Sequence, residues 1–270
     1  MKKTIKLALL VLLLVPVGVF LIKQQQQLSK IQGVKTAIEE NQQQNKIDGI
    51  ILPHHNLAKA IIIDSYQKLS QEQFELIVLI GPNHFYPKIG EIISSKVFDN
   101  AQLQTADWLI NTLLDNDLIK LNQTMLASEH SILTHSDYLN EFFPEAEILP
   151  LVIPVNPDPN KMRTIRDFLV NLPTKTLFIA SVDFAHNLSY LEALENNQES
   201  LEAIQGFAYE KINSFDDQHL DSPKSIILLL EIMKEKGSTN FQVLHNTHSA
   251  LIDQQINSLG TSYLIGTFQQ

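Results

Sequence analysis

The chain has 270 residues, of which 44% are hydrophobic, and its 30 acidic and 20 basic residues give a formal net charge of −10. An acidic chain repels phosphate backbones, which argues against nucleic acid as a partner. There is no cysteine, so disulfides, thiolate metal sites, iron–sulfur clusters and thiol catalysis are excluded, and nine histidines are the nitrogen ligands available to a metal.

The first predicted element is an apolar segment near the N-terminus. Residues 5–22 contain a single charge, Lys6, and as a helix they would span about 27 Å, close to the hydrocarbon thickness of a bilayer. Lys2 and Lys3 precede the segment, which favours an extracytoplasmic domain. No Ala-x-Ala cleavage pattern follows. We therefore expect a transmembrane anchor over residues 1–23 of a single-pass membrane protein; a cleaved signal segment and a secreted product are the alternative.

A polar segment separates this apolar stretch from the remainder of the chain. Residues 24–46 contain two glutamine-rich runs, a composition typical of a linker. Residues 47–270 are enough for one sizeable domain with a full core, and they show no internal repeat or second domain boundary.

Short apolar runs alternate with helical patterns through residues 47–270. The predicted strands are 47–52, 76–80, 91–95, 146–154, 176–181, 240–247 and 261–268. The predicted helices are 57–69, 105–116, 160–172, 190–212 and 223–237. Pro150, inside one of the strands, indicates an edge or bulged strand. This alternation predicts an α/β fold with a sheet covered by helices on both faces.

Three histidines each follow a different predicted strand by a few residues. They are His54, His84 and His186, and Asp183 lies in the same loop as His186. Ligands of open α/β sheets bind at the carboxyl ends of the strands, so parallel neighbouring strands would bring the three imidazoles together. Imidazole binds zinc, iron, copper and nickel. The pattern therefore predicts a metal site and leaves the metal open.

Five short motifs occur in order along this part of the chain. They are Pro53-His54, Gly81-Pro82-Asn83-His84, Glu129-His130-Ser131 with a later His135, Asp183-Phe184-Ala185-His186, and Ser262-Tyr263. Their order and spacing resemble those of the Memo family, the AmmeMemoRadiSam system protein B group, which is akin to the LigB-type, class III extradiol dioxygenases. The resemblance implies a single Memo/LigB-like domain over residues 47–270, with a mixed, largely parallel central sheet flanked by helices.

The resemblance also implies a mononuclear metal site in which His54 and His84 are two of the ligands. The third ligand of Memo-type members is often a cysteine, and Asp221 aligns with it in this chain, while related dioxygenases use a glutamate. His219 or Asp217 could take this place instead. Asp221 also precedes a predicted helix start, where aspartate is a favoured cap.

Three further residues have expected catalytic roles. Asp183 could orient a metal-bound imidazole, as carboxylates commonly do. His130 and His186 are candidates for proton transfer, because imidazole titrates near neutrality. The alternative for both histidines is structural hydrogen bonding. His135 lies five residues after His130, so we expect it behind the site at best.

The leading functional expectation is a membrane-anchored, non-haem iron dioxygenase-like oxidoreductase with an unknown small-molecule substrate. Kinship favours Fe(II) as the one divalent ion, with zinc or copper as alternatives. A second hypothesis is a zinc-dependent hydrolase at the same site, since zinc lowers the pKa of a bound water. A third is a non-catalytic binding module that retains the fold. The family resemblance also implies a radical-SAM enzyme as a partner.

Overall fold

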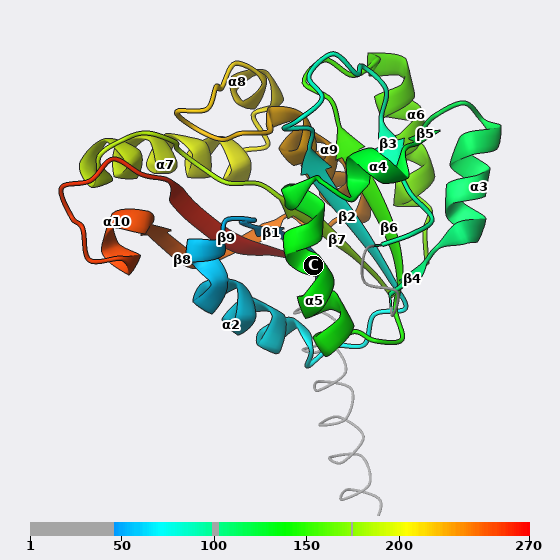
Figure 1. Cartoon of the computed structure of the whole chain (residues 1–270), viewed down its shortest axis with the longest axis horizontal. Helices are drawn as coiled ribbons and strands as arrows, with labels where there is room; N and C mark the ends of the chain where they lie inside the picture. The colour runs from blue at the N-terminus through cyan, green and yellow to red at the C-terminus, as the bar shows by residue number, and fades with distance from the viewer. Residues whose placement is uncertain (1–45, 99–102, 174) are drawn as a thin grey trace, which may run out of the picture. The chain divides into compact units, whose positions relative to one another are not determined.

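A central sheet organises the computed structural model of the chain, which describes residues 46–98, 103–173 and 175–270 (Figure 1). Residues Ile47–Gln270 form one compact unit. Its strands are β1 Ile47–Leu52, β2 Leu76–Pro82, β3 Ile93–Ser94, β4 Gln104–Thr105, β5 Lys120–Leu121, β6 Glu147–Ile153, β7 Thr176–Ser181, β8 Asn240–His248 and β9 Ser262–Gln269. The sheet order is β5-β3-β6-β2-β7-β1-β9-β8, and β4 also pairs with β6. The four central strands, β6, β2, β7 and β1, run parallel.

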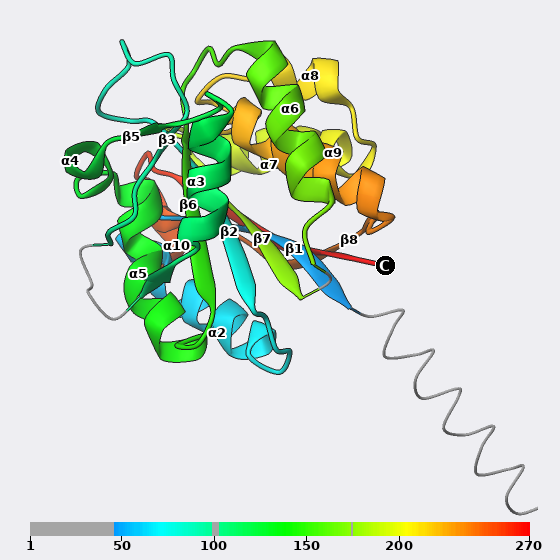
Figure 2. The ribbon, with the colours of Figure 1, turned by 90° about the vertical axis from the view of Figure 1, so that its right-hand side faces the viewer.

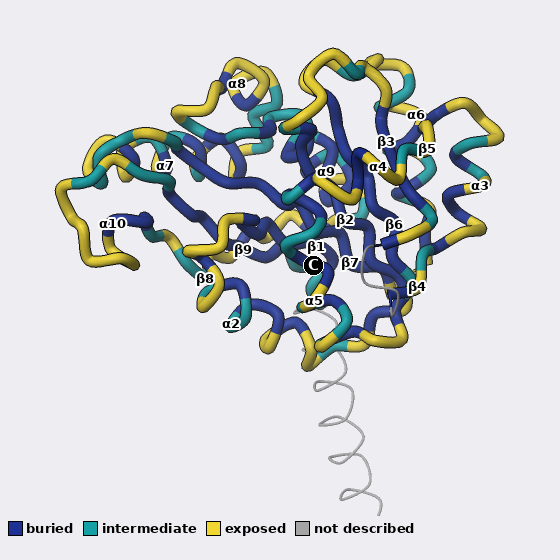
Figure 3. The backbone as a smooth tube through the Cα atoms, viewed as in Figure 1, coloured by how far each residue is buried: buried dark blue, intermediate teal, exposed yellow. Residues whose placement is uncertain are grey.

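Helices cover both faces of this sheet. They are η1 Asn56–Ala58, α2 Lys59–Leu69, α3 Asp107–Asp115, α4 Gln123–Leu126, α5 His130–Phe142, α6 Pro159–Val170, α7 Tyr190–Gln205, α8 Tyr209–Asn213, α9 Pro223–Lys236 and α10 Ser249–Ile252. Helices α2 and α5 pack on one face, while α3, α6 and α9 pack on the other (Figure 2). The central strands are buried as a result, whereas exposed residues lie in the outer helices, in the loops and in outer strands such as β8 (Figure 3). The continuous apolar run of β2 is the pattern expected of a strand covered on both faces.

Two predicted elements differ from the structure. The helix expected over residues 190–212 is broken into α7 and α8, because the chain turns at Gly206 and at Phe207, whose φ is 51°. The strand β6 lies inside the sheet, paired with β2 along its whole length. On its other side β4 and β3 reach only its two ends, so Pro150 falls between them and needs no ladder partner for its missing N–H.

The structure does not support the prediction of a membrane-spanning helix. Across the described ranges, no helix is both long and apolar enough to cross a bilayer. The longest of them, α7, has 16 residues and several glutamates, whereas a span needs about 20 predominantly apolar residues. Residues 1–23, on which the prediction was based, lie outside the described residues, as does most of the linker at 24–46. The described residues therefore give no support to the predicted single-pass membrane location.

Gly81, near the end of β2, allows α5 to pack closely against the sheet. A Cβ atom at this position would lie 2.5 Å from the Ser131 Oγ atom and 2.8 Å from the Ser131 Cβ atom. The Ser131 hydroxyl donates a hydrogen bond to the Pro82 carbonyl oxygen at 2.9 Å. The absence of a side chain at Gly81 therefore sets the distance between β2 and the first turn of α5.

We expect Gly81→Ala to lower the free energy of unfolding by about 1 to 3 kcal/mol, the usual cost of overpacking a core. Urea denaturation measures this change. Gly90→Ala is the matched control, because a Cβ there meets nothing within 4 Å, and its effect should stay within about 0.5 kcal/mol. Equal stability of the two variants would contradict the proposed packing constraint.

Candidate metal centre

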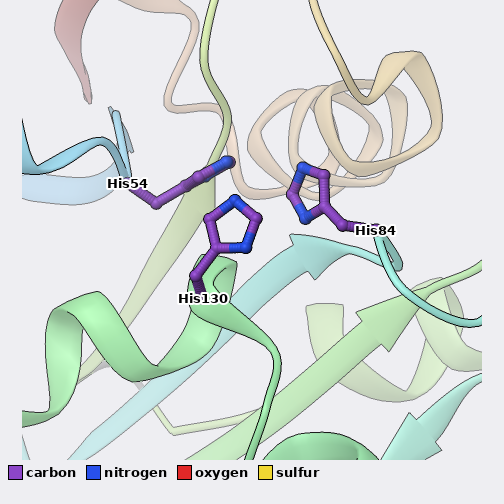
Figure 4. Close-up of side chains that lie close together, drawn as sticks. All are labelled: His54, His84 and His130. Atoms are coloured by element: carbon purple, nitrogen blue, oxygen red, sulfur yellow. The ribbon is translucent and has the colours of Figure 1, made fainter.

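Three histidines meet at the carboxyl edge of the central strands. Parallel pairing places Leu52 beside Ser181 and Ile80 beside Ala180, so β1, β7 and β2 end at the same edge. His54 and His84 each lie two residues beyond a strand, and His130 is the first residue of α5. The three rings face one another (Figure 4). Ring centroids are 5.0 Å apart for His54–His84, 5.0 Å for His54–His130 and 4.2 Å for His84–His130.

The carboxylate of Asp221 lies against two of these imidazoles. Its Oδ2 atom is 3.2 Å from His54 Nε2 and 3.6 Å from His84 Nε2. Its Oδ1 atom is buried and has no hydrogen-bond partner among the described residues. The backbone N–H of Asp221 donates to the Asp183 carbonyl oxygen at 3.1 Å, and the Asp183 N–H donates back to Asp221 Oδ2 at 3.3 Å. The loop before α9 is thus fixed to the chain leaving β7.

The other ring nitrogens of His54 and His84 face partners outside the cluster. His54 Nδ1 lies 3.1 Å from Ser181 Oγ, and His84 Nδ1 lies 2.7 Å from Glu129 Oε1. Glu129 is fully buried and also accepts hydrogen bonds from the backbone N–H groups of His84 and Ser131. These contacts fix the orientation of both rings and leave their Nε2 atoms directed at Asp221.

Two donor separations in this arrangement are compatible with one metal ion. Protein nitrogen and oxygen ligands lie about 2.0 to 2.2 Å from zinc, so two donors at angles between 90° and tetrahedral are about 3 to 3.5 Å apart. The two distances from Asp221 Oδ2 are close to this range. Among the described residues, the groups whose ligand atoms all lie within 4.8 Å of one another are His54 with His84 and His130, and His54 with Asp183 and Asp221. Because His54 belongs to every set, it is the common member of the centre.

Opposite charges in the cluster shift the pKa values of its groups. Burial alone would lower the pKa of His84, but hydrogen bonds with Asp221 and Glu129 raise it to about 9. Burial likewise opposes a charge on His54, and the carboxylates of Asp183 and Asp221 outweigh it and raise that pKa. Burial would raise the pKa of Asp221, but the two imidazoles lower it overall. Asp221 is therefore ionised near neutral pH, as a metal ligand must be.

The pKa values of His130 and Asp183 shift in the directions opposite to those of the other two histidines and of Asp221. Burial, followed by the positive charges of His84 and His54, lowers the pKa of His130 to about 4, so its imidazole is neutral near pH 7. Burial raises the pKa of Asp183. The Asp183 Oδ1 atom accepts a hydrogen bond from the His54 backbone N–H at 3.0 Å, and its Oδ2 atom is 3.7 Å from His54 Nε2. Asp183 thus holds the backbone of His54 and lies beside its ring.

His186 is the predicted site residue that does not join the three facing rings. Its backbone N–H donates to the Asp217 carbonyl oxygen at 2.8 Å, and its side chain lines a cavity of about 680 Å³ that also borders His84 and Asp221. We expected His54, His84 and His186 to converge. The structure instead brings His54 and His84 together with His130. The sequence signal for His130 was the Glu129-His130-Ser131 motif, and in the structure the Glu129 side chain caps α5, which begins at His130.

The alternatives for the third ligand lie elsewhere. His219 Nε2 is 3.0 Å from Glu199, and its ring stacks on Phe215. Asp217 is exposed at the cavity rim. The cap of α9 is Ser222, whose hydroxyl accepts from the Ser225 N–H, so the helix-cap interpretation of Asp221 is wrong. Of these residues, only Asp221 has its side-chain carboxylate against the rings of His54 and His84.

Known proteins are similar to this chain in sequence and in fold. The Memo-like protein family matches residues 17–264. A MEMO1 family protein of Aquifex aeolicus (strain VF5) is 20% identical over 167 residues, which cover 57% of this chain and 43% of that protein. The chain thus matches less than half the length of this relative. The crystal structure of uncharacterized protein JW3007 from Escherichia coli K12 has a TM-score of 0.56 at 13% identity, covering 83% of this chain and 100% of that chain, which shows a shared fold.

The family match covers nearly all of the described domain and includes all six predicted site residues. It confirms the resemblance drawn from the motifs: the chain belongs to the Memo-like protein family.

Proposed function

We propose that the chain is a metal-dependent protein that binds one divalent ion through His54, His84 and Asp221 and takes a small molecule in the adjoining cavity. The observation that carries this proposal is the position of Asp221 Oδ2, 3.2 Å and 3.6 Å from the two Nε2 atoms. Two imidazoles and one carboxylate with open positions are the donor set of non-haem Fe(II) sites, so Fe(II) is the ion we favour. An ion so held would activate an oxygen-containing ligand or substrate at an open position.

The residues around the ligands have separate tasks in this proposal. Glu129 holds the ring of His84, and Asp183 holds the backbone of His54. His186 lines the cavity, and its buried Nδ1 atom has no hydrogen-bond partner among the described residues. We therefore assign His186 to proton exchange with the bound molecule. His130, whose side chain is 45% exposed and neutral, is the second candidate for proton transfer or a further metal ligand.

The identity of the ion can be measured on protein purified anaerobically without added metal. We expect about one iron per chain by elemental analysis. Air exposure followed by dialysis should release part of this iron. One zinc per chain with no iron would contradict the Fe(II) assignment and would instead favour a hydrolytic site, for which two histidines and a carboxylate are also known ligands.

The double variant His54→Ala, His84→Ala should lose the ion, because both imidazole ligands are removed. We expect less than about a tenth of the parent metal content, as elemental analysis of matched preparations would show. His245→Ala is the control, since His245 pairs with Asp64 away from the cluster. Unchanged metal content in the double variant would place the ion elsewhere.

Asp221→Asn tests the third ligand with little change in side-chain size. Loss of the charged ligand should weaken metal binding by more than the 10- to 100-fold typical of an outer partner. Titration of the metal-free protein gives this affinity. Asp217→Asn, a change of the same kind at the cavity rim, should leave it within about twofold of the parent. If instead Asp217→Asn weakens binding and Asp221→Asn does not, the third ligand is misassigned.

A further inference from the structure

A line of buried polar side chains runs from His54 into the core of the domain. His54 Nδ1 lies 3.1 Å from Ser181 Oγ, which lies 3.0 Å from His135 Nε2. His135 Nδ1 in turn lies 3.0 Å from the Tyr66 hydroxyl. The four residues belong to the loop after β1, to β7, to α5 and to α2. The line therefore joins the candidate metal centre to both helices on one face of the sheet.

This line is closed to solvent. Tyr66, His135 and Ser181 have no exposed surface, and His54 is 2% exposed. The ring of Tyr66 packs against Phe142 and Phe143. Polar groups in such surroundings must satisfy one another, because an unpaired one costs about 1 to 3 kcal/mol. The hydrogen positions within the line thus depend on its own members and on what binds at its metal end.

The Ser181 hydroxyl hydrogen can go to either neighbouring imidazole, and this choice decides which ring nitrogens carry hydrogens. A neutral imidazole has one N–H and one lone pair, and a hydroxyl has one hydrogen to donate. If His54 Nδ1–H donates to Ser181, the Ser181 hydroxyl is free to donate to His135 Nε2. His135 then carries its hydrogen on Nδ1 and donates it to the Tyr66 oxygen.

The opposite direction would prevent metal binding. In that case the hydroxyl of Tyr66 donates to His135, His135 donates to Ser181, and Ser181 donates to His54 Nδ1. A neutral His54 then carries its hydrogen on Nε2, the atom that faces Asp221. Of these two directions, only the first leaves a lone pair on His54 Nε2, where the ion is proposed to bind.

We infer that Ser181 and His135 are positioning residues that hold His54 as the Nδ1–H tautomer, with its Nε2 lone pair directed at Asp221 and His84. This inference rests on the proposed metal site. His84 is held differently, because its Nδ1 atom lies against the ionised carboxylate of Glu129. Burial lowers the pKa of His135 to about 3, so this imidazole stays neutral, as a donor on one side and an acceptor on the other.

The test is a Co(II) titration of the full chain, with the absorption spectrum of the bound ion as a second readout. Ser181→Ala and His135→Leu remove the support of His54 Nδ1. Each should weaken Co(II) binding about 10- to 100-fold, the range for outer partners of metal-bound histidine, and should alter the Co(II) spectrum. His135→Gln can place an acceptor near the position of Nε2, and it should restore binding to within about threefold of the parent.

Ser94→Ala is the matched control for Ser181→Ala. Ser94 is also fully buried, and its hydroxyl donates to the Pro150 carbonyl oxygen at 2.7 Å, outside the cluster. Its loss should affect stability without changing the Co(II) spectrum. If Ser181→Ala binds Co(II) like the parent, or if Ser94→Ala alters the spectrum equally, the positioning role is contradicted.

A measurement on the unmodified chain covers the case in which a variant does not fold. Nitrogen-15 NMR of the Zn(II)-loaded chain should show His135 as the Nδ1–H tautomer. An Nε2–H tautomer of His135 would overturn the inference whatever the variants do. A parent chain that binds neither Co(II) nor Zn(II) contradicts the proposed metal site itself. A parent that binds them, with Ser181→Ala unaffected, contradicts only the role of the buried line.

Discussion

The parallel hydrogen bonding of β1, β7 and β2 is the constraint on which the candidate site depends. It places Leu52 beside Ser181 and Ile80 beside Ala180, so three connections leave the sheet at one edge. His54 and His84 are there because each lies two residues past a strand end. A one-residue slip of a strand would turn its side chains to the opposite face. The site is thus specified by the register of the sheet, and the loops add the remaining groups.

Charge pairing makes this concentration of buried ionisable groups tolerable. Three imidazoles lie among the carboxylates of Glu129, Asp183 and Asp221. Burying an unpaired charge costs several kcal/mol, and removal of one member of a buried pair leaves that cost uncompensated. Each of these carboxylates contacts a histidine, and the backbone N–H groups of His54, His84 and Asp183 supply further hydrogen bonds. Affinity for a cation and stability of the fold are therefore coupled at this edge of the sheet.

Part of the site was predictable from the sequence. The apolar runs of β1, β2 and β7 and the polar residues after them pointed to His54 and His84 with general rules alone. Asp221 was found only through resemblance to a family, because nothing local distinguishes it from a helix cap. The hydrogen bonds of Ser181 with His54 and His135 have no signal in the sequence, since packing of α5 on the sheet creates them. His186 follows a strand too, but its backbone pairs with Asp217, and among the described residues the ring contacts between histidines join only His54, His84 and His130.

The candidate ligands are supplied by segments far apart in the chain, from the loop after β1 to the start of α9. No hairpin or single βαβ unit contains them all. An ion bound there would have affinity for the assembled domain and little for any unfolded or partly folded form. By mass action, a free ion at 100 times its dissociation constant would add about 2.7 kcal/mol to the stability of the whole domain. The ion would then link segments from distant parts of the chain, and its concentration would set how much stability the domain gains.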